Sequence, residues 1–459
     1  MDETIVAIST PAGEGGIGIV RLSGKKALSI ADKIFVPKDK GRPSRFKTYT
    51  VHYGHIVKKD EIIDEVILTV MRAPKSYTRE DVVEINCHGG IIAIRKVLDL
   101  VLDSGARLAL PGEFTKRAFI NGRIDLAQAE AVLDVIRSKT ESSARVALGQ
   151  LEGGLSGKIR RLSRQLVDVL GEMEARIDFS EEDIEFQPQQ KNLKALTKVS
   201  DGLSRLIEGA WKGMILKEGI MCVICGKPNV GKSSLMNVLL RRNRVIVTPI
   251  PGTTRDAIEE EINLKGIPVR LVDTAGISAA KNIVEKYGIK KSRSYIKTAD
   301  LILFMIDLGR RWSKRDMAIL SGIKGKNFMV IANKSDLAEK LNTDRIKKIT
   351  GKDEIIKVSL LRKKNLEKLE EAILRKIWHG EIPHPEGAFV TNLRHKKDLE
   401  GALLCVKKAM KSISGEKGAF PEIAASLLKG AVSFLGSVLG DEVEPDILER
   451  IFSKFCVGK

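Results

Sequence analysis

Four short motifs between residues 226 and 336 contain the residue types that bind and hydrolyse a nucleoside triphosphate. The first, at 226–233, fits the G-x-x-x-x-G-K-[ST] pattern of a P-loop and follows an apolar run at 220–225 that is typical of a buried strand. Its backbone N–H groups and Lys232 can hold phosphates, and the Ser233 hydroxyl can bind Mg²⁺. This motif predicts a nucleotide ligand without saying which nucleotide it is.

The other three motifs follow in the order expected of a GTPase. Residues 252–256 read G-T-T-R-D, and Thr254 is a candidate for the Mg²⁺ shell. Residues 273–276 read D-T-A-G, where Asp273 can reach the metal through water and the Gly276 N–H can reach the γ-phosphate. Residues 333–336 read N-K-S-D, and a carboxylate there can accept both N–H donors of guanine, which adenine lacks. Together the motifs predict a guanine nucleotide.

The residue after the D-T-A-G motif is unusual. Ras-like GTPases place a glutamine there, which orients the attacking water. In this chain the residue is Ile277, which has no polar group. The sequence therefore predicts a GTPase with a different catalytic apparatus.

The net charge of the 459-residue chain, +19, is concentrated in one segment. Residues 220–378 contain 33 Lys and Arg against 17 Asp and Glu, an excess of 16, and the rest of the chain has an excess of only 3. This segment either contacts a polyanion such as RNA or has a lysine-rich surface without a partner. Aromatic residues make up only 5%, which does not favour stacking on single-stranded bases.

The composition also excludes several classes of protein. The five cysteines are scattered and odd in number, which is typical of a reducing cytoplasm and not of a disulfide framework. Cys222 and Cys225 form a C-x-x-C pair, but they lie on the predicted P-loop strand, which does not favour a metal or redox role. No apolar run approaches the roughly 20 residues of a membrane span, and the N-terminus lacks the basic and apolar regions of a secretory signal. We therefore expect a cytoplasmic protein without membrane contact.

Hydrophobic periodicity predicts an α/β P-loop GTPase domain inserted in an α-helical domain, preceded by an α+β N-terminal domain. The expected domains are 1–121 (α+β), 122–217 (first helical half), 218–378 (GTPase, mostly parallel sheet) and 379–459 (second helical half). Strands are expected near 4–9, 17–22, 49–56, 62–71 and 82–87, and helices near 25–35, 90–104, 393–413, 420–439 and 445–455.

Several stretches resemble one family over nearly the whole chain. They are T-P-A-G-E-G-G-I-G-I-V-R-L-S-G at 10–24, S-Y-T-R-E-D-V-V-E at 76–84, P-G-E-F-T-K-R-A-F-I-N-G-R-I-D-L-A-Q-A-E-A at 111–131, I-D-F-S-E-E-D-I-E-F at 177–186 and R-I-F-S-K-F-C-V-G-K at 450–459. On these stretches the chain resembles the tRNA modification GTPase MnmE (TrmE) family. The ending is the most diagnostic stretch, because other GTPases lack it.

The resemblance implies functions for both ends of the chain. It implies that the N-terminal domain binds 5-formyltetrahydrofolate or a related tetrahydrofolate and forms the homodimer. The implied folate contacts are Arg21, Glu80, Arg123 and Lys459, and Cys456 is implied in tRNA modification. With MnmG, an FAD-dependent partner that forms a heterotetramer or larger complex with it, the family builds an aminomethyl or carboxymethylaminomethyl group on C5 of the wobble uridine of certain tRNAs.

The resemblance also implies how GTP is hydrolysed. In that family K⁺ stimulates the reaction when two G domains face each other. The resemblance implies that Glu285 orients the attacking water, a task for which Ile277 has no polar group. The implied K⁺ ligands are Asn229 and main-chain oxygens of Thr248, Ile250 and Thr253; those of Mg²⁺ are Ser233 and Thr254. The implied GTP-binding residues are Asn229, Val230, Gly231, Lys232, Ser233, Ser234, Thr248, Pro249, Ile250, Pro251, Gly252, Thr253, Thr254, Asp273, Thr274, Ala275, Gly276, Asn333, Lys334 and Asp336.

One alternative from another class stays open at this point. A regulatory or ribosome-assembly GTPase without modification activity shares the same GTPase motifs. The folate-type N-terminus and the C-V-G-K ending favour an enzyme of tRNA modification instead. The loop that often supplies a base-stacking S-A-K motif reads S-L-L at 359–361, so its guanine contacts are not predicted.

Overall fold

The computed structural model describes residues 3–11, 13–178, 189–243, 259–273, 294–378, 388–414 and 421–459. The chain forms two compact units. The first contains Met1–Leu133, Ile159–Val167 and Leu428–Lys459, and the second contains Asp134–Lys158 and Asp168–Leu427.

A seven-stranded sheet forms the N-terminal part of the first unit. Its strands are β1 (Ile5–Ile8), β2 (Gly18–Ser23), β3 (Phe35–Pro37), β4 (Thr50–Lys58), β5 (Glu61–Met71), β6 (Val82–Cys87) and β7 (Arg107–Leu108). The order is β3-β4-β5-β6-β2-β1-β7, and only the β1–β7 pair is parallel. Helices α1 (Ala27–Ile34) and α2 (Ile91–Asp103) pack their apolar sides on this sheet. A short 3₁₀ helix, Pro43–Arg45, precedes β4.

The C-terminal end of the chain joins this first unit. Helix α15 (Pro445–Phe452) packs near α3 (Glu113–Ile120), where Phe452 and Phe455 share a core with Ala118 and Leu126. Beyond α15, the Gly458 carbonyl accepts hydrogen bonds from Ser9 and from Arg21 of β2. Gly458 has φ 96°, and a Cβ there would lie 2.4 Å from the Ile8 carbonyl oxygen, so only glycine fits. The last residues therefore lie against β1 and β2.

The second unit contains a six-stranded sheet with the order β13-β12-β11-β8-β10-β9. The strands are β8 (Ile220–Gly226), β9 (Glu259–Leu264), β10 (Ile267–Asp273), β11 (Leu301–Asp307), β12 (Phe328–Asn333) and β13 (Ile355–Lys357). All pairs are parallel except β9–β10, which confirms the prediction of a mostly parallel sheet. The parallel strands are buried apolar runs, as expected for a sheet covered on both faces.

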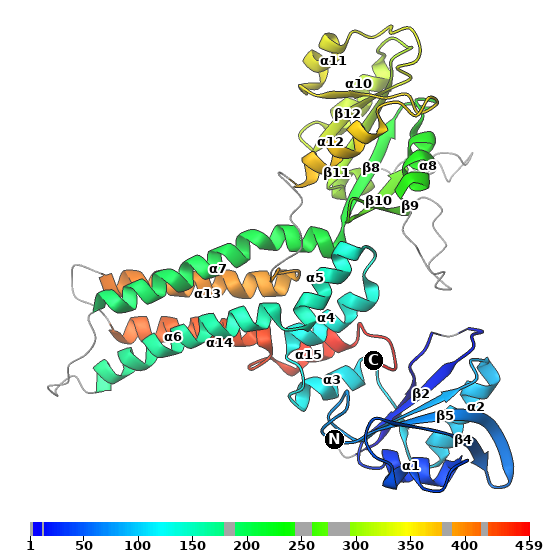
Figure 1. The fold of residues 1–459 in the computed structure, drawn as a ribbon. Helices are drawn as coiled ribbons and strands as arrows, with labels where there is room; N and C mark the ends of the chain where they lie inside the picture. Colours follow the sequence, from blue (N-terminus) through cyan, green and yellow to red (C-terminus); the bar gives the residue numbers. More distant parts are fainter. Residues whose placement is uncertain are drawn as a thin grey trace. The chain divides into compact units, whose positions relative to one another are not determined.

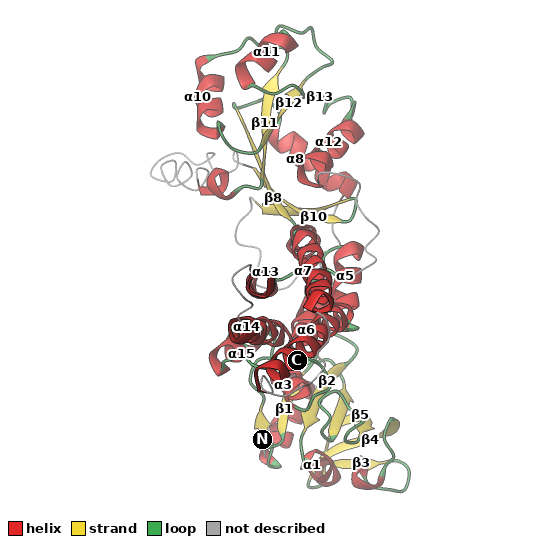
Figure 2. Cartoon of the chain, turned by 90° about the vertical axis from the view of Figure 1, so that its left-hand side faces the viewer, coloured by secondary structure: helices red, strands yellow, loops and turns green. Residues whose placement is uncertain are grey.

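Helices cover both faces of this sheet. One face packs against α8 (Lys232–Asn243) and α12 (Leu366–Trp378), and the other against α10 (Lys314–Ile323) and α11 (Thr343–Thr350). Figure 2 shows α10 on one side of the strands, with α8 and α12 on the other. The carboxyl ends of β8, β10, β11 and β12 thus meet at one edge, which is where such sheets bind ligands.

The remaining helices flank the GTPase segment in sequence. They are α4 (Leu126–Arg137), α5 (Glu141–Leu151), α6 (Gly154–Asp178), α7 (Gln189–Glu218), α13 (Leu393–Ser414) and α14 (Pro421–Leu439). Helix α7 ends just before β8, and α13 begins soon after α12. Even so, α7 and α13 lie side by side (Figure 1). This packing confirms that the GTPase domain is inserted in a helical domain.

The antiparallel β9–β10 hairpin contacts α5 at its turn. The Thr140 hydroxyl caps α5 and donates to the Gly266 carbonyl at 2.8 Å, and the side chains of Lys139 and Glu261 form an ion pair nearby. Gly266 has φ 94°, and a Cβ there would lie 2.4 Å from the Ser142 hydroxyl oxygen. The turn and the helix start therefore fit closely.

One sequence expectation needs correction. Helix α14 has 19 residues with a mean hydropathy of 1.4 in its most apolar window, so the statement that no segment approaches a membrane span was wrong by length and composition. Core helices of soluble proteins pass the same test, and 39% of this window is buried against the protein. Arg21 lies inside β2, as the strand expected at 17–22 implies.

Candidate functional site

The P-loop joins β8 to α8 and has the backbone shape of a phosphate-binding loop. Gly226, Asn229 and Gly231 have φ angles of 149°, 64° and 105°, the positive-φ backbone that glycine adopts without strain and that phosphate-binding loops use. The Lys232 ammonium donates to the carbonyls of Gly226 at 3.0 Å and Lys227 at 2.9 Å, so it lies inside this loop. Burial lowers the pKa of Lys232, while Asp273 opposes that shift.

The next two predicted metal-site residues meet at the start of α8. Ser233 donates from its hydroxyl to the Asp273 carboxylate at 2.7 Å, and Asp273 is only 5% exposed at the end of β10. The D-T-A-G aspartate and the P-loop serine are therefore brought together from positions 40 residues apart. Both offer oxygen atoms, which are the ligands that Mg²⁺ prefers.

The N-K-S-D motif, after β12, is bonded to the P-loop. The amide of Asn333, 4% exposed, donates to the Val230 carbonyl at 2.8 Å and accepts from the Leu360 N–H at 3.3 Å. A Cβ on Gly231 would lie 2.4 Å from the Asn333 amide nitrogen. Asn333 therefore connects the phosphate loop to the loop at 359–361.

Two further residues of this motif, Lys334 and Asp336, are held by partners that sequence reasoning missed. Lys334, at φ 65°, forms a 2.7 Å ion pair with Asp307 at the end of β11. Asp336 accepts a hydrogen bond from the Ser359 hydroxyl, which is the main cause of its lowered pKa. The serine of the S-L-L loop therefore positions the carboxylate that is predicted to read guanine. Asp307 could have been found, because it ends an apolar strand at the same sheet edge.

A second missed contact links the P-loop to α10. The Lys227 ammonium lies 2.6 Å from the Asp316 carboxylate and 3.2 Å from the Ser313 hydroxyl. Asp316 also caps the start of α10 by accepting from the N–H and hydroxyl of Ser313. This buried ion pair fixes one side of the P-loop to the helix on that face of the sheet.

Part of the predicted site lies outside the described residues. This holds for Thr248, Pro249, Ile250, Pro251, Gly252, Thr253, Thr254, Thr274, Ala275, Gly276 and Glu285. Of the predicted K⁺ ligands, only Asn229 is described; of the predicted Mg²⁺ ligands, only Ser233. The described residues Val230, Gly231, Lys232, Ser234, Asp273, Asn333, Lys334 and Asp336 all belong to the P-loop, the start of α8 or the loops at the same sheet edge.

Three of the predicted folate residues gather around β2 and the C-terminal end. The guanidinium of Arg21 lies 5.9 Å and that of Arg123 lies 4.7 Å from the centre of the Tyr77 ring. Lys459 is half-buried beside Arg21, and both burial and that neighbouring charge lower its pKa. Glu84 pairs with Arg21 at 2.7 Å. Tyr77 and Glu84 are thus members of this cluster that sequence reasoning did not name.

The fourth predicted folate residue, Glu80, belongs to an adjoining ion-pair network. Its carboxylate accepts from the Ser23 hydroxyl at 2.7 Å and from Arg117 at 3.0 Å. Arg117 is 1% exposed and also binds Glu113 at 3.0 Å. Glu80 is therefore held from the protein side, in part by Ser23, which lies two residues from Arg21 on the same face of β2.

Glu113 is the strongly perturbed carboxylate of this network. Burial opposes its ionisation, but hydrogen bonds from Arg107, the Leu110 N–H and Arg117 outweigh burial and lower the pKa of Glu113 to about 2. Arg107 binds it with two nitrogens, at 2.6 and 2.8 Å. The Glu113 carboxylate therefore remains charged at neutral pH and stabilises the start of α3.

The cysteines divide into buried and exposed groups. Burial raises the pKa of Cys225 to about 12 and that of Cys222 further, so the C-x-x-C pair on β8 is a pair of inert core thiols. Cys456 is exposed, and its carbonyl accepts from the Gly112 N–H at 3.4 Å. Within the described ranges, His, Cys, Asp and Glu side chains form no cluster of three that could hold a metal ion.

Comparison with known proteins assigns both ends of the chain. The family model described as "GTP-binding protein TrmE N-terminus" matches residues 4–123, and "MnmE helical domain" matches residues 126–456. Curated relatives named tRNA modification GTPase MnmE match over the full length of both chains. The relative from Alkaliphilus oremlandii is 47% identical over 462 residues, and that from Bacillus licheniformis 44% over 460 residues.

A solved structure of an Era GTPase from Aquifex aeolicus, bound to GDP and aluminium fluoride, is 31% identical. The match covers 43% of this chain and 68% of the Era chain, with a TM-score of 0.29. It therefore adds no argument about the fold. The full-length relatives and the two family models decide the assignment, and they agree with the P-loop geometry. The chain belongs to the tRNA modification GTPase MnmE family, whose members are GTPases that work in modification of the wobble uridine of tRNA.

Proposed function

We propose that this chain is a K⁺-stimulated GTPase whose catalytic form is a homodimer. We further propose that it helps to install an aminomethyl or carboxymethylaminomethyl group at C5 of the wobble uridine of certain tRNAs. The observation that carries the proposal is the single connected site at the sheet edge. There the P-loop, Asp273 and the N-K-S-D motif at 333–336 are bonded to one another through Ser233 and Asn333.

Ser233, at the start of α8, and Asp273, at the end of β10, have oxygen atoms that suit Mg²⁺. Ser233 and Asp273 present a hydroxyl and a carboxylate oxygen 2.7 Å apart. Ser233 would hold the metal directly, and Asp273 would hold it through water, with Thr254 as the further ligand. The metal would neutralise charge on the β- and γ-phosphates. Lys232 would hold the same phosphates, and the N–H groups of the P-loop would orient them.

The proposed K⁺ site rests on Asn229. This residue has φ 64° in the P-loop, beside the N–H groups that would bind phosphate. Main-chain oxygens of Thr248, Ile250 and Thr253 would complete the site. A cation there would stabilise the charge that develops during cleavage, which is the task of an arginine finger in other GTPases. Glu285 would orient the attacking water, because Ile277 has no group that can do so.

The proposed folate site is the cluster of Arg21, Arg123 and Lys459 around Tyr77. A tetrahydrofolate carries carboxylates and a flat ring, and this cluster offers three cations and an aromatic face. Glu80 would accept hydrogen bonds from the ring of the ligand with the lone pairs that Arg117 and Ser23 leave unused. The folate would supply the one-carbon unit, and the exposed Cys456 lies on the same C-terminal stretch as Lys459.

The proposed assembly follows the family. Its partners are a second copy of this chain, which makes the homodimer, the FAD-dependent protein MnmG in a heterotetramer or larger complex, and tRNA. We place this assembly in the cytoplasm. The buried and reduced thiols of β8 and the +19 charge support a protein that works on RNA in a reducing compartment.

The test is GTP hydrolysis by the full-length protein in KCl and in NaCl at equal ionic strength. We expect faster hydrolysis in KCl for the wild type, loss of that difference in Asn229→Ala, and slow turnover with normal nucleotide affinity in Glu285→Ala. Asn327→Ala, at the opposite end of β12, is the matched control and should behave as wild type. Equal wild-type rates in both salts would overturn the cation-dependent mechanism.

A further inference from the structure

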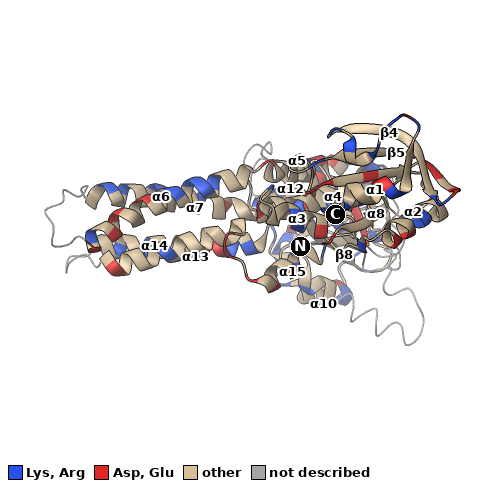
Figure 3. Ribbon diagram, turned by 90° about the horizontal axis from the view of Figure 1, so that it is seen from below, with Lys and Arg blue, Asp and Glu red and all other residues tan. Residues whose placement is uncertain are grey.

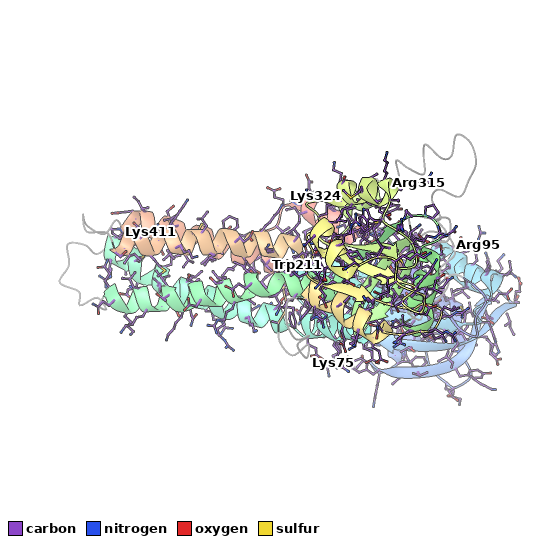
Figure 4. The ribbon with its side chains drawn as sticks, turned by 90° about the horizontal axis from the view of Figure 1, so that it is seen from above. Lys75, Arg95, Trp211, Arg315, Lys324 and Lys411 are labelled. Carbon is purple, nitrogen blue, oxygen red and sulfur yellow. The ribbon has the colours of Figure 1, made fainter. Side chains whose placement is uncertain are left out.

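The positive charge of the GTPase domain is prominent around one helix. We define the α10 surface as the exposed side chains of Arg310, Arg311, Lys314, Arg315, Lys324 and Lys340. Figure 3 shows Lys and Arg on α10, and Figure 4 shows Arg315 and Lys324 near the two ends of this helix. Helix α10 has ten residues, so the surface extends over roughly 15 Å.

A hollow of about 610 Å³ lies at the N-terminal side of this surface. Its lining consists of Gly309, Arg310, Arg311 and Lys340. The backbone N–H of Lys340 donates to the Leu308 carbonyl at 2.8 Å, which holds the 340 loop beside the residues that follow β11. Three cations from two separate loops therefore face one space, and the lining contains no apolar side chain.

The neighbouring carboxylates do not neutralise these cations. Asp307 forms an ion pair with Lys334 at 2.7 Å. Of the cations in the α10 surface, it pairs only with Arg310, at 3.6 Å. Asp316 is buried against Lys227. Glu339, next to Lys340 in sequence, pairs with Lys357. Within the described part of the chain, the other five cations of the α10 surface have no ion-pair partner, so their charge is available to a ligand.

The chemistry of the surface selects the ligand. A polyanion with regularly spaced charges fits several cations spread over such a length, and a protein partner would need apolar or aromatic anchors that the hollow lacks. Among the described residues of the GTPase domain, the exposed large apolar side chains are Met317, Leu337 and Leu361, and none is aromatic. Contact with phosphates is therefore favoured over stacking with bases.

We propose that the α10 surface binds the phosphate backbone of tRNA. This inference rests on the family's function in tRNA modification and adds a place where the GTPase domain contacts the substrate. The contact positions the RNA without reading its sequence, because phosphates carry no sequence information directly. Binding there should therefore depend strongly on salt and weakly on the identity of the tRNA.

The experiment measures the affinity of the full-length protein for a fluorescently labelled tRNA transcript at KCl concentrations from about 50 to 200 mM. The test variant is Arg311→Gln/Lys314→Gln/Lys340→Gln. The matched control is Arg241→Gln/Lys368→Gln/Lys376→Gln, which removes the same charge from α8 and α12 on the other face of the sheet. GTP hydrolysis in KCl is measured for both variants, and neither set belongs to the proposed catalytic or nucleotide-binding residues.

We expect the test variant to bind tRNA roughly 100-fold more weakly at 0.1 M KCl, because each lost phosphate contact lowers the salt slope by about 0.7–0.9. The slope of log Kd against log[KCl] should fall by about 2–3. The control should stay within about threefold of wild type, since distant surface charges are screened. GTP hydrolysis should be unchanged in both.

Three results would overturn the inference. Equal losses in the two variants would show a general charge effect, and no loss in the test variant would show that RNA binds elsewhere. Loss of binding to the flavoprotein partner with tRNA affinity intact would make the α10 surface a protein-docking site. In all three cases K⁺-stimulated hydrolysis stays a separate measurement, so the proposed GTPase mechanism stands or fails independently.

Discussion

Removing the Asn333 side chain should uncouple the P-loop from the loop at 359–361. The buried amide bonds the Val230 carbonyl at 2.8 Å and the Leu360 N–H at 3.3 Å. A buried polar group that loses its partner costs about 1–3 kcal/mol. Loss of the 2.8 Å bond to the Val230 carbonyl should account for the larger part of the destabilisation. Loss of the 3.3 Å bond from the Leu360 N–H should cost an amount at the lower end of that range. We therefore expect Asn333→Ala to lower the free energy of unfolding of the GTPase domain by about 2–4 kcal/mol.

Urea unfolding followed by tryptophan fluorescence measures this loss. Two of the three tryptophans, Trp312 and Trp378, lie in the GTPase segment and report on it. With a slope of about 2 kcal/mol per molar urea, the midpoint should fall by about 1–2 M. The control is Asn327→Ala, at the start of β12, where the exposed amide bonds the Asp300 carbonyl and its loss should cost much less.

A double-mutant cycle tests the geometry itself. Gly231→Ala should destabilise the domain, because φ is 105° and the new Cβ would lie 2.4 Å from the Asn333 amide nitrogen. Combining it with Asn333→Ala removes that clash, so the two losses should be less than additive by about 0.5–3 kcal/mol. Additive losses, or equal midpoints for Asn333→Ala and Asn327→Ala, would refute the idea that this amide ties the two loops together.

Two further predictions concern acid stability and thiol reactivity. The pKa of Glu113 is about 2 in the folded protein against 4.5 in the unfolded chain, so its contribution of about 3 kcal/mol is complete above pH 5 and is lost as the pH falls toward 2. Glu113→Gln should therefore lower the free energy of unfolding in urea at pH 7 and make that free energy fall less steeply in acid. Glu61→Gln, at an exposed site, should have neither effect. Parallel pH curves for the wild type and Glu113→Gln would contradict the stabilising role of Glu113. A thiol reagent at neutral pH should modify Cys456 quickly and the buried Cys222 and Cys225 only after unfolding, because burial raises the pKa of both buried thiols. Mass spectrometry of the labelled protein measures the order in which the cysteines react. Cys456→Ser should remove the fast phase of labelling. Early labelling of Cys222 or Cys225 on β8 would disprove the prediction.

The sequence predicted those parts of the site that are contiguous in the chain. The P-loop strand and the start of α8 at Lys232 follow from an apolar run and a fixed motif within 14 residues, and both are confirmed. The main strands of the N-terminal sheet were predicted for the same reason, since alternating apolar residues define them locally. Strands β3 and β7, of three and two residues, were missed, because pairing with neighbours and not local composition forms them.

Partners that are distant in sequence could not be predicted. Lys334 meets Asp307 across 27 residues and Asn333 meets Val230 across 103, and both contacts depend on which strands are neighbours in the sheet. The same holds for Tyr77, which lies between Arg21 and Arg123 only once the chain has folded. A motif names the residues that touch the ligand, and the topology decides which residues hold them in place.

The β9–β10 hairpin has a mechanical consequence for the GTP cycle. Strand β9 begins at Glu259, five residues after the proposed Mg²⁺ ligand Thr254, and β10 ends at Asp273, which is proposed to hold the metal through water. Paired strands resist stretching, and the seven residues of β10 form a stiff rod of roughly 23 Å. The far end of that rod is fastened where Thr140 donates to the Gly266 carbonyl. Any movement of Asp273 along the strand must therefore push or pull on the start of α5 or break this hydrogen bond.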